Sequence, residues 1–233
     1  MAAPFPEVII FDVDGVLVDV RGSFHATVLE TVRHFTGKQV TRHELHEWKN
    51  RSGFNDDWKL STAWVQSLGG KQEYAGVKAK FVEFYWGGGG KRGNVEKEKW
   101  LLPRTALARL AKRAELAIFT GRVAAELDYT LDRLRVREYF QRIVTVEDVQ
   151  RPKPDPEGLV KILAGRDPAQ ALYIGDNVDD ALSAWAAKIP FVGILPQSVD
   201  HRQARGALLK KHGAVAVLRE ITQLEGWLAR RRA

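Results

Sequence analysis

The stretch FDVDGVLVD, Phe11–Asp19, follows directly on the apolar run Val8–Ile10. That run has the length of a buried strand, so Asp12 and Asp14 lie where the strand ends. Their spacing of two residues directs both carboxylates to the same side of an extended chain, and Gly15 permits a sharp turn after them. Two like charges this close are unfavourable unless a cation or a shared proton compensates them. A turn with purely structural, capping aspartates is the alternative.

Beyond residue 101 the chain alternates short apolar runs with longer amphipathic ones, which is typical of a parallel α/β sheet. The candidate strands are residues 7–12, 115–119, 142–145, 170–175, 190–194 and 214–218. The candidate helices are residues 104–113, 123–135, 155–164, 178–187, 201–211 and 219–230. We therefore predict an α/β fold, a doubly wound and mainly parallel Rossmann-like sheet.

The roughly 80 residues between the first strand and the next αβ unit are too many for a loop. Apolar residues recur at helical spacing in four segments, residues 23–36, 41–50, 56–68 and 72–86. We predict an inserted α-helical cap domain over the carboxyl edge of the sheet, with residues 1–20 and 100–233 as the catalytic core and residues 21–99 as the cap. The run Gly87–Gly90 predicts a flexible loop.

The composition is that of an ordinary globular protein, because 45% of the 233 residues are hydrophobic. No cysteine is present, which excludes disulfides, thiolate nucleophiles and cysteine-ligated metals and fits a reducing compartment. No apolar run reaches the ~20 residues of a membrane span, and the first residues lack the pattern of a secretion signal. We expect a cytoplasmic protein with no membrane partner.

The formal net charge of +7 is unevenly distributed. Residues 20–100 and 201–233 are basic, whereas the remainder of the chain is acidic. Such an arrangement suits a cation-binding centre that receives an anion, since basic surroundings steer anions inward. The basic tail with Arg230–Arg232 is equally explained as a solvated face. Nucleic acid is not an expected partner, because no recognition motif is present.

Polar residues follow four of the candidate strands, at the sheet edge where open parallel sheets bind ligands. They are Asp12 and Asp14, then Thr120-Gly121-Arg122, then Lys153 between two prolines, then Asp176 with Asp180 four residues on. A hydroxyl, helix-start amides and a lysine match phosphate oxygens, whereas the carboxylates match a cation. Taken singly, Thr120 is equally well a helix cap and Lys153 an exposed turn lysine.

In this order the four motifs resemble the haloacid dehalogenase (HAD) superfamily, and within it the phosphoglycolate-phosphatase-like and β-phosphoglucomutase-like branch, which has a helical cap after the first strand. The resemblance covers nearly the whole chain. It implies that Asp12 is a nucleophile that forms an aspartyl-phosphate and that Asp14 is the general acid and base. In haloalkanoate dehalogenases the corresponding motif resembles Asp-x-Tyr, because a halide leaves without a second acid. The presence of Asp14 therefore favours phosphoryl transfer.

The resemblance also implies a Mg²⁺ ion bound by a carboxylate oxygen of Asp12, the backbone carbonyl of Asp14 and the side chain of Asp176. Asp180 would support these ligands. Thr120, the amide of Gly121 and Lys153 would hold the phosphoryl oxygens. We expect a Mg²⁺-dependent phosphatase for a small phosphorylated metabolite. The alternatives are a sugar phosphomutase and a non-catalytic module that binds a phosphorylated ligand.

Three positions have open roles. Many relatives have Thr-Asn where this chain has Thr120-Gly121-Arg122, so Arg122 is either an additional cation beside the site or a helix-start residue that faces solvent. Arg51 and Asn55 are expected to contact the substrate, with a surface arginine and an Asn/Asp helix cap as the alternative. Asp19 is expected to be a hinge or a cap for the first inserted helix.

Overall fold

The computed structural model describes residues 4–49, 51, 54, 56–196 and 202–231. Its internal contacts divide the chain into two compact units. The first, called the sheet unit below, comprises Met1–Val18 and Trp100–Ala233, and the second, called the helical unit, comprises Asp19–Lys99. Among the described residues, no helix is both long enough and apolar enough to cross a membrane.

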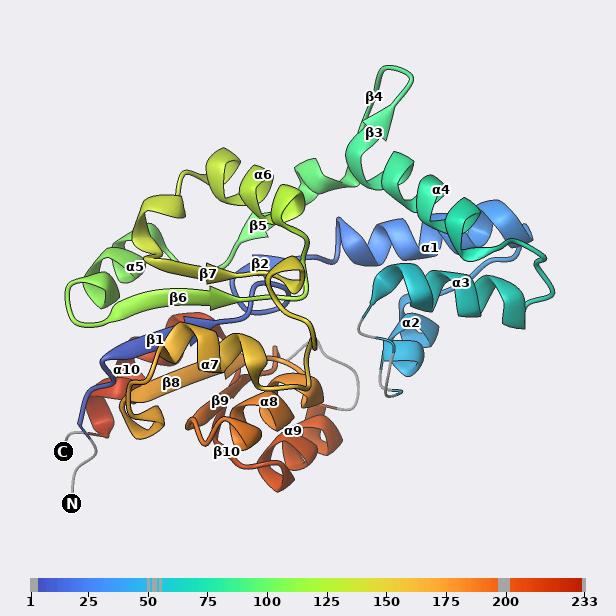
Figure 1. The fold of residues 1–233 in the computed structure, drawn as a ribbon. Coiled ribbons are helices and arrows are strands. Elements are labelled where there is room, and N and C mark those ends of the chain that lie inside the picture. The colour runs from blue at the N-terminus through green and yellow to red at the C-terminus, as the bar shows by residue number, and fades with distance from the viewer. Residues whose placement is uncertain (1–3, 50, 52–53, 55, 197–201, 232–233) are drawn as a thin grey trace. The chain divides into compact units, whose positions relative to one another are not determined.

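The sheet unit contains a six-stranded parallel sheet in the order β10-β9-β8-β1-β6-β7 (Figure 1). The strands are β1 (Val8–Phe11), β6 (Glu115–Phe119), β7 (Arg142–Val144), β8 (Ala171–Gly175), β9 (Phe191–Ile194) and β10 (Ala214–Leu218). The first strand lies centrally, between β6 and β8, and all four of its residues are buried. A strand that is buried on both faces has a continuous run of apolar residues, so the sequence alone predicted β1.

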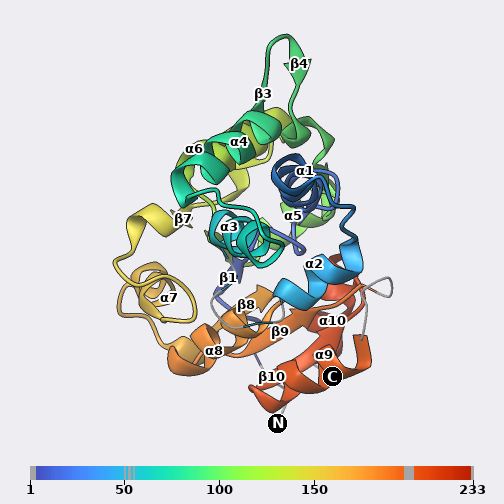
Figure 2. The ribbon, with the colours of Figure 1, turned by 90° about the vertical axis from the view of Figure 1, so that its right-hand side faces the viewer.

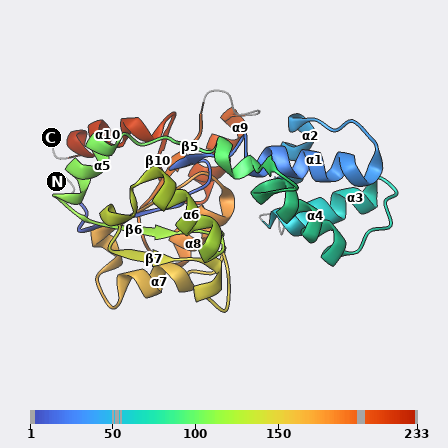
Figure 3. The ribbon, with the colours of Figure 1, turned by 90° about the horizontal axis from the view of Figure 1, so that it is seen from above.

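Within the described part of this unit, six helices connect and cover the strands: α5 (Arg104–Ala111), α6 (Ala124–Leu134), α7 (Glu157–Leu163), α8 (Val178–Ala186), α9 (Arg202–Lys211) and α10 (Leu224–Arg230). Residues of α7, α8 and α9 share one core with the side chains of Val8, Ile10 and Tyr173. On the opposite face lie α5 and α10 (Figure 3), which an ion pair of 2.6 Å joins between Arg109 and Glu225. Helices on both faces confirm the predicted doubly wound α/β fold.

The described residues also form shorter elements. The 3₁₀ turns are η1 (Asn94–Lys97), η2 (Arg137–Tyr139), η3 (Val146–Asp148), η4 (Pro168–Gln170) and η5 (Ile221–Gln223). Two small two-stranded sheets pair β2 (Val18–Asp19) with β5 (Lys99–Trp100) and β3 (Gly87–Gly88) with β4 (Lys91–Arg92).

The helical unit consists mainly of α1 (Phe24–Thr36), α2 (Arg42–Lys49), α3 (Asp57–Ser67) and α4 (Tyr74–Trp86). Figure 2 shows α1 and α3 end-on and side by side. Aromatic side chains fill this unit, and the ring of Phe24 stacks on that of Tyr85 with 4.5 Å between centroids. Asp56 caps α3 by accepting hydrogen bonds from the backbone N–H groups of Trp58 and Lys59.

The expected flexible loop at the glycine run is wrong, because Gly87–Gly88 and Lys91–Arg92 form an antiparallel hairpin. The two residues between these strands, Gly89 and Gly90, have φ angles of 58° and 79°. A two-residue hairpin loop of type I′ needs positive φ at both positions, and glycine supplies it without steric cost. The glycines therefore specify a turn.

Asp19 does not cap the first helix of the helical unit, which was one of the two roles expected for it, the other being a hinge. The N-cap of α1 is Ser23, and its side chain makes no capping hydrogen bond. The carboxylate of Asp19 instead accepts hydrogen bonds from the backbone N–H and the guanidinium of Arg21, the shortest at 2.6 Å. This local pair satisfies Asp19 before the helix begins, and it lowers the pKa of the carboxyl group.

The contact between α7 and the sheet generates a stability prediction. Gly158 lies in α7, where a Cβ atom would approach Cε2 of the Phe119 ring to 2.2 Å. We expect Gly158→Ala to lower the free energy of unfolding by about 1–3 kcal/mol, because the buried ring must shift. Urea unfolding followed by circular dichroism measures this change.

Gly226→Ala is the matched control, since Gly226 also lies in a helix of the sheet unit and the nearest atom to its added Cβ is the flexible tip of Arg230 at 3.5 Å. This substitution should raise the free energy of unfolding by up to about 1 kcal/mol. Equal effects of the two substitutions would contradict the packing described for Gly158.

Candidate active site

The ends of adjacent strands bring the polar motifs together. Asp12 follows β1, Thr120 follows β6, and Asp176 follows β8, and β1 pairs with both of the other strands. The backbone N–H of Asp12 donates to the carbonyl of Ile174 at 2.8 Å, which extends the pairing beyond the strands. Carboxyl ends of parallel strands lie at one edge of a sheet, so residues far apart in the sequence become neighbours there.

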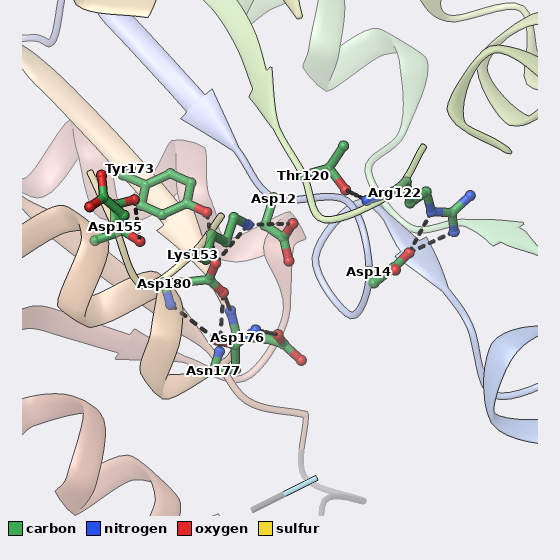
Figure 4. Close-up of polar contacts among 11 residues, drawn as sticks. Asp12, Asp14, Thr120, Arg122, Lys153, Asp155, Tyr173, Asp176, Asn177 and Asp180 are labelled. Carbon is green, nitrogen blue, oxygen red and sulfur yellow. Dashed lines mark hydrogen bonds and ion pairs between the residues drawn. The ribbon is translucent and has the colours of Figure 1, made fainter. Parts of the chain in front are cut away.

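Lys153 lies buried between two carboxylates (Figure 4). Its Nζ donates to Oδ1 of Asp12 at 2.9 Å and to Oδ1 of Asp180 at 2.8 Å. The side chains of Lys153, Asp12 and Asp180 are 4%, 6% and 0% exposed. The ammonium group also lies 4.8 Å from the centre of the Phe119 ring. Lys153 is therefore not the exposed turn lysine that was the alternative.

Asp180 is held by four donors. Its Oδ1 accepts from Lys153 and from the hydroxyl of Tyr173 at 2.7 Å, and its Oδ2 accepts from the backbone N–H groups of Asp176 and Asn177 at 3.1 and 3.3 Å. In return, the N–H of Asp180 donates to Oδ1 of Asn177, which completes a capping box at the start of α8. With both oxygens engaged, Asp180 can orient the site but has little capacity to bind an ion directly.

Three carboxylates and one ammonium group gather in this network. Oxygen atoms of Asp12, Asp176 and Asp180 lie within 4.8 Å of one another, and Lys153 forms ion pairs with Asp12 and Asp180. Burial raises the pKa of Asp12, an effect that the charge of Lys153 opposes. For Lys153, burial favours the neutral amine, but the attraction of Asp12 and Asp180 prevails and raises its pKa. A second cation would stabilise the remaining negative charge.

The residues present fit a hard divalent cation, whose preferred ligands are oxygen atoms. Oδ2 of Asp12 accepts no hydrogen bond from any residue in the described parts of the chain. The carboxylate of Asp176 lies against Gly15, where a Cβ atom would be 2.3 Å from Oδ2 of Asp176. Gly15 has a φ angle of 75°, and together these features require glycine at this turn. The turn that carries the carbonyl of Asp14 thus lies beside Asp176.

Donors suited to an anion lie beside these carboxylates. Thr120 is buried, and its Oγ1 accepts from the backbone N–H of Arg122 at 3.2 Å. Within the described ranges, neither the hydroxyl proton of Thr120 nor the N–H of Gly121 has an acceptor. The ammonium of Lys153 has three N–H bonds and uses two of them. Thr120 does not cap α6, whose N-cap is Val123.

Arg122 does not face solvent, so that alternative is wrong. Its side chain is 1% exposed, its Nε donates to Oδ1 of Asp14 at 2.7 Å, and its Nη2 forms an ion pair of 2.6 Å with the same oxygen. Its Nη1 donates to Oγ1 of Thr130 on α6 at 2.9 Å. Partners on both sides keep the guanidinium inside the sheet unit. The side chain of Asp14 is 37% exposed.

Arg51 and Asn55, the two other residues expected to contact substrate, fall within Asp19–Lys99, the sequence range of the helical unit. Arg51 is exposed, and its guanidinium lies 4.2 Å from the centre of the Trp48 ring. Asn55 lies outside the described residues. Contact of either residue with a substrate therefore stays a prediction.

Two residues of this network were missed in the sequence. Tyr173 lies within the apolar strand β8, where it had counted only as core, but a buried tyrosine hydroxyl needs a hydrogen-bond partner. Asn177 and Asp180 have the N-cap and N3 spacing of a capping box, a signal present in the sequence. The packing of the strand faces was needed to pair Tyr173 with Asp180.

The sequence of this chain matches a family model and several known proteins. A family model described as haloacid dehalogenase-like hydrolase matches residues 97–194. An imidazoleglycerol-phosphate dehydratase of Phytophthora nicotianae is 30% identical over 94% of this chain and 51% of that protein. Phosphoglycolate phosphatase 1 of Pseudomonas aeruginosa is 26% identical over 81% of this chain and 69% of that protein. The chain thus spans about half the length of the first of these relatives.

A solved structure supports the fold. A HAD family hydrolase of Deinococcus radiodurans R1, crystallised with bound phosphate and sodium, aligns with a TM-score of 0.72. The alignment covers 98% of this chain and 97% of that one, at 21% sequence identity. Through the family model over residues 97–194 and through these relatives, the chain is similar to the haloacid dehalogenase-like hydrolases, and the solved structure has the same fold.

Proposed function

We propose that this protein is a Mg²⁺-dependent phosphatase that hydrolyses a small phosphomonoester through an aspartyl-phosphate. The observation that carries the proposal is the buried carboxylate of Asp12, which Lys153 holds beside Asp176 at the carboxyl edge of the sheet. A nucleophile, an oxygen-rich cation site and free donors for an anion lie together there. The name of the Pseudomonas aeruginosa relative supports this reaction class.

In the first step the carboxylate of Asp12 attacks phosphorus. A bond forms between an Asp12 oxygen and phosphorus, and the bond from phosphorus to the leaving oxygen breaks. The carboxyl group of Asp14 gives its proton to that oxygen, so the leaving group departs as an alcohol. Thr120, the amide of Gly121 and Lys153 hold the phosphoryl oxygens and offset their charge.

In the second step water attacks the phosphorus of the aspartyl-phosphate. Asp14, now ionised, takes a proton from the water, and the bond between Asp12 and phosphorus breaks. Inorganic phosphate leaves, and both carboxyl groups return to their starting protonation states.

Asp12, Asp176 and the carbonyl of Asp14 would hold the Mg²⁺ ion, with Asp180 and its hydrogen bonds as support. The bound ion supplies positive charge that stabilises the phosphoryl group during transfer. The sheet unit would be the catalytic core and the helical unit the cap, in which Arg51 and Asn55 remain candidates for contact with the leaving group.

The first prediction concerns substrates and products. The purified protein with Mg²⁺ should release inorganic phosphate from at least one aliphatic phosphomonoester in a panel that includes 2-phosphoglycolate, imidazoleglycerol phosphate and sugar phosphates. Colorimetric phosphate detection and product analysis measure the outcome. Conversion of a sugar phosphate to its isomer without free phosphate would identify a mutase instead, and no turnover of any phosphate would contradict both.

A second prediction concerns the nucleophile. Asp12→Asn should lower turnover by at least about a thousandfold, because the amide lacks the charge and nucleophilicity of a carboxylate. Asp128→Asn is the matched control: Asp128 is half exposed on α6, where it pairs with Arg137, and its substitution should leave turnover unchanged. Retention of full turnover by Asp12→Asn would rule out the aspartyl-phosphate.

The third prediction concerns the ion and has a readout apart from activity. After treatment with EDTA, addition of Mg²⁺ should raise the midpoint of thermal unfolding, because a ligand that binds the folded state stabilises it. Asp176→Asn should abolish this rise. Asp179→Asn should preserve the rise, because Asp179 precedes Asp180 in α8 but does not belong to the cluster of Asp12, Asp176 and Asp180. If Asp176→Asn retains the rise, the ion lies elsewhere.

A further inference from the structure

The ion pair of Arg122 and Asp14 uses one oxygen of the carboxylate. Nε of Arg122 donates to Oδ1 of Asp14 at 2.7 Å, and Nη2 lies 2.6 Å from the same oxygen. Oδ2 of Asp14 receives no hydrogen bond from any residue of the described ranges. The carboxylate is therefore fixed through one oxygen, whereas the other is available to exchange a proton.

Arg122 is itself immobilised from several directions. Its backbone N–H donates to Oγ1 of Thr120, and its carbonyl accepts from the N–H of Val146 at 3.2 Å. At the far end of the side chain, Nη1 donates to Oγ1 of Thr130. The hydroxyl of Thr130 in turn donates to the carbonyl of Glu126, one turn earlier in α6. Through these hydrogen bonds the guanidinium of Arg122 connects Asp14 to α6.

We propose that Arg122 is the positioning residue for the general acid: it holds Asp14 by Oδ1 so that Oδ2 meets the leaving oxygen of the substrate. This inference rests on the proposed function and adds a residue to it. A half-exposed aspartate without this partner would rotate among several conformations, and misplacement of a proton donor by about 1 Å can cost about a hundredfold in rate. Arg122 keeps all its own protons. The proton that is transferred belongs to Asp14, and it passes from Oδ2 to the leaving oxygen as the bond from phosphorus to that oxygen breaks.

The leaving group provides the test, because only poor leaving groups need the proton. An aliphatic alcohol leaves slowly as an alkoxide, whereas p-nitrophenolate leaves without protonation. We expect Arg122→Gln to lower kcat/KM by about a hundredfold on the aliphatic phosphomonoester that the wild type hydrolyses, and by less than about tenfold on p-nitrophenyl phosphate. The use of kcat/KM restricts the comparison to the first step, before water attacks.

Two further variants separate positioning from a structural effect. Thr130→Val removes the acceptor of Arg122 Nη1 but keeps the ion pair, so it should show a smaller loss with the same preference for the p-nitrophenyl substrate. The double variant Asp14→Asn/Arg122→Gln should be no slower than Asp14→Asn alone, because both changes remove one function. Equal losses on both substrates, or additive losses in the double variant, would overturn the inference.

A crystal structure of Arg122→Gln gives a readout that needs no turnover. We expect the Asp14 carboxylate to leave its present position or to occupy more than one, while Asp12 and Lys153 stay in place. If Asp14 keeps its position without the guanidinium, Arg122 does not position it. A wild-type protein that hydrolyses neither substrate would refute the proposed phosphatase, and the crystal structure would still decide whether Arg122 holds Asp14.

Discussion

A buried lysine shared by two carboxylates is the interaction around which the sheet unit is organised. Lys153 is bonded to Asp12 after the first strand and to Asp180 on α8. Burial of three charges is costly unless each is paired and its hydrogen-bonding capacity is used. The hydroxyl of Tyr173 and two backbone N–H groups supply the missing bonds on Asp180. Polar groups from several segments of the chain therefore hold Lys153 and Asp180 in place beside the carboxylate of Asp12.

A second constraint on the site is the close approach of the backbone at two glycines to the carboxylates of Asp176 and Asp180. Gly15 and Gly175 each lie where a Cβ atom would collide with a carboxylate, of Asp176 and of Asp180 respectively. Larger residues would push these carboxylates away from the end of β1. The two glycines thus allow these carboxylates to lie close to one another at the end of β1, which is the arrangement of oxygen atoms that the proposed cation site requires.

The sequence predicted most of this arrangement, for a physical reason. Strands buried on both faces are apolar throughout, so the strand before Asp12 and the strand before Asp176 were recognisable, and ligands of such sheets lie at strand ends. Two features that were not predicted depend on packing between segments, namely the partner of Arg122 and the bond of Tyr173 to Asp180. The hairpin at Gly87–Gly90 is different, because its glycine turn is a local signal that was interpreted as a loop. A motif specifies which side chains are present, but not which of them are buried against each other.

The sheet unit also closes on itself at the point where the helical unit is inserted. The N–H of Leu101 donates to the carbonyl of Leu17 at 2.8 Å, so the chain returns within one hydrogen bond of where it departed. An insertion with adjacent ends adds little strain to its host, whatever its length or fold. The sheet unit can then keep its fold when the inserted segment is lengthened, shortened or replaced, because such changes leave the residues at the strand ends untouched.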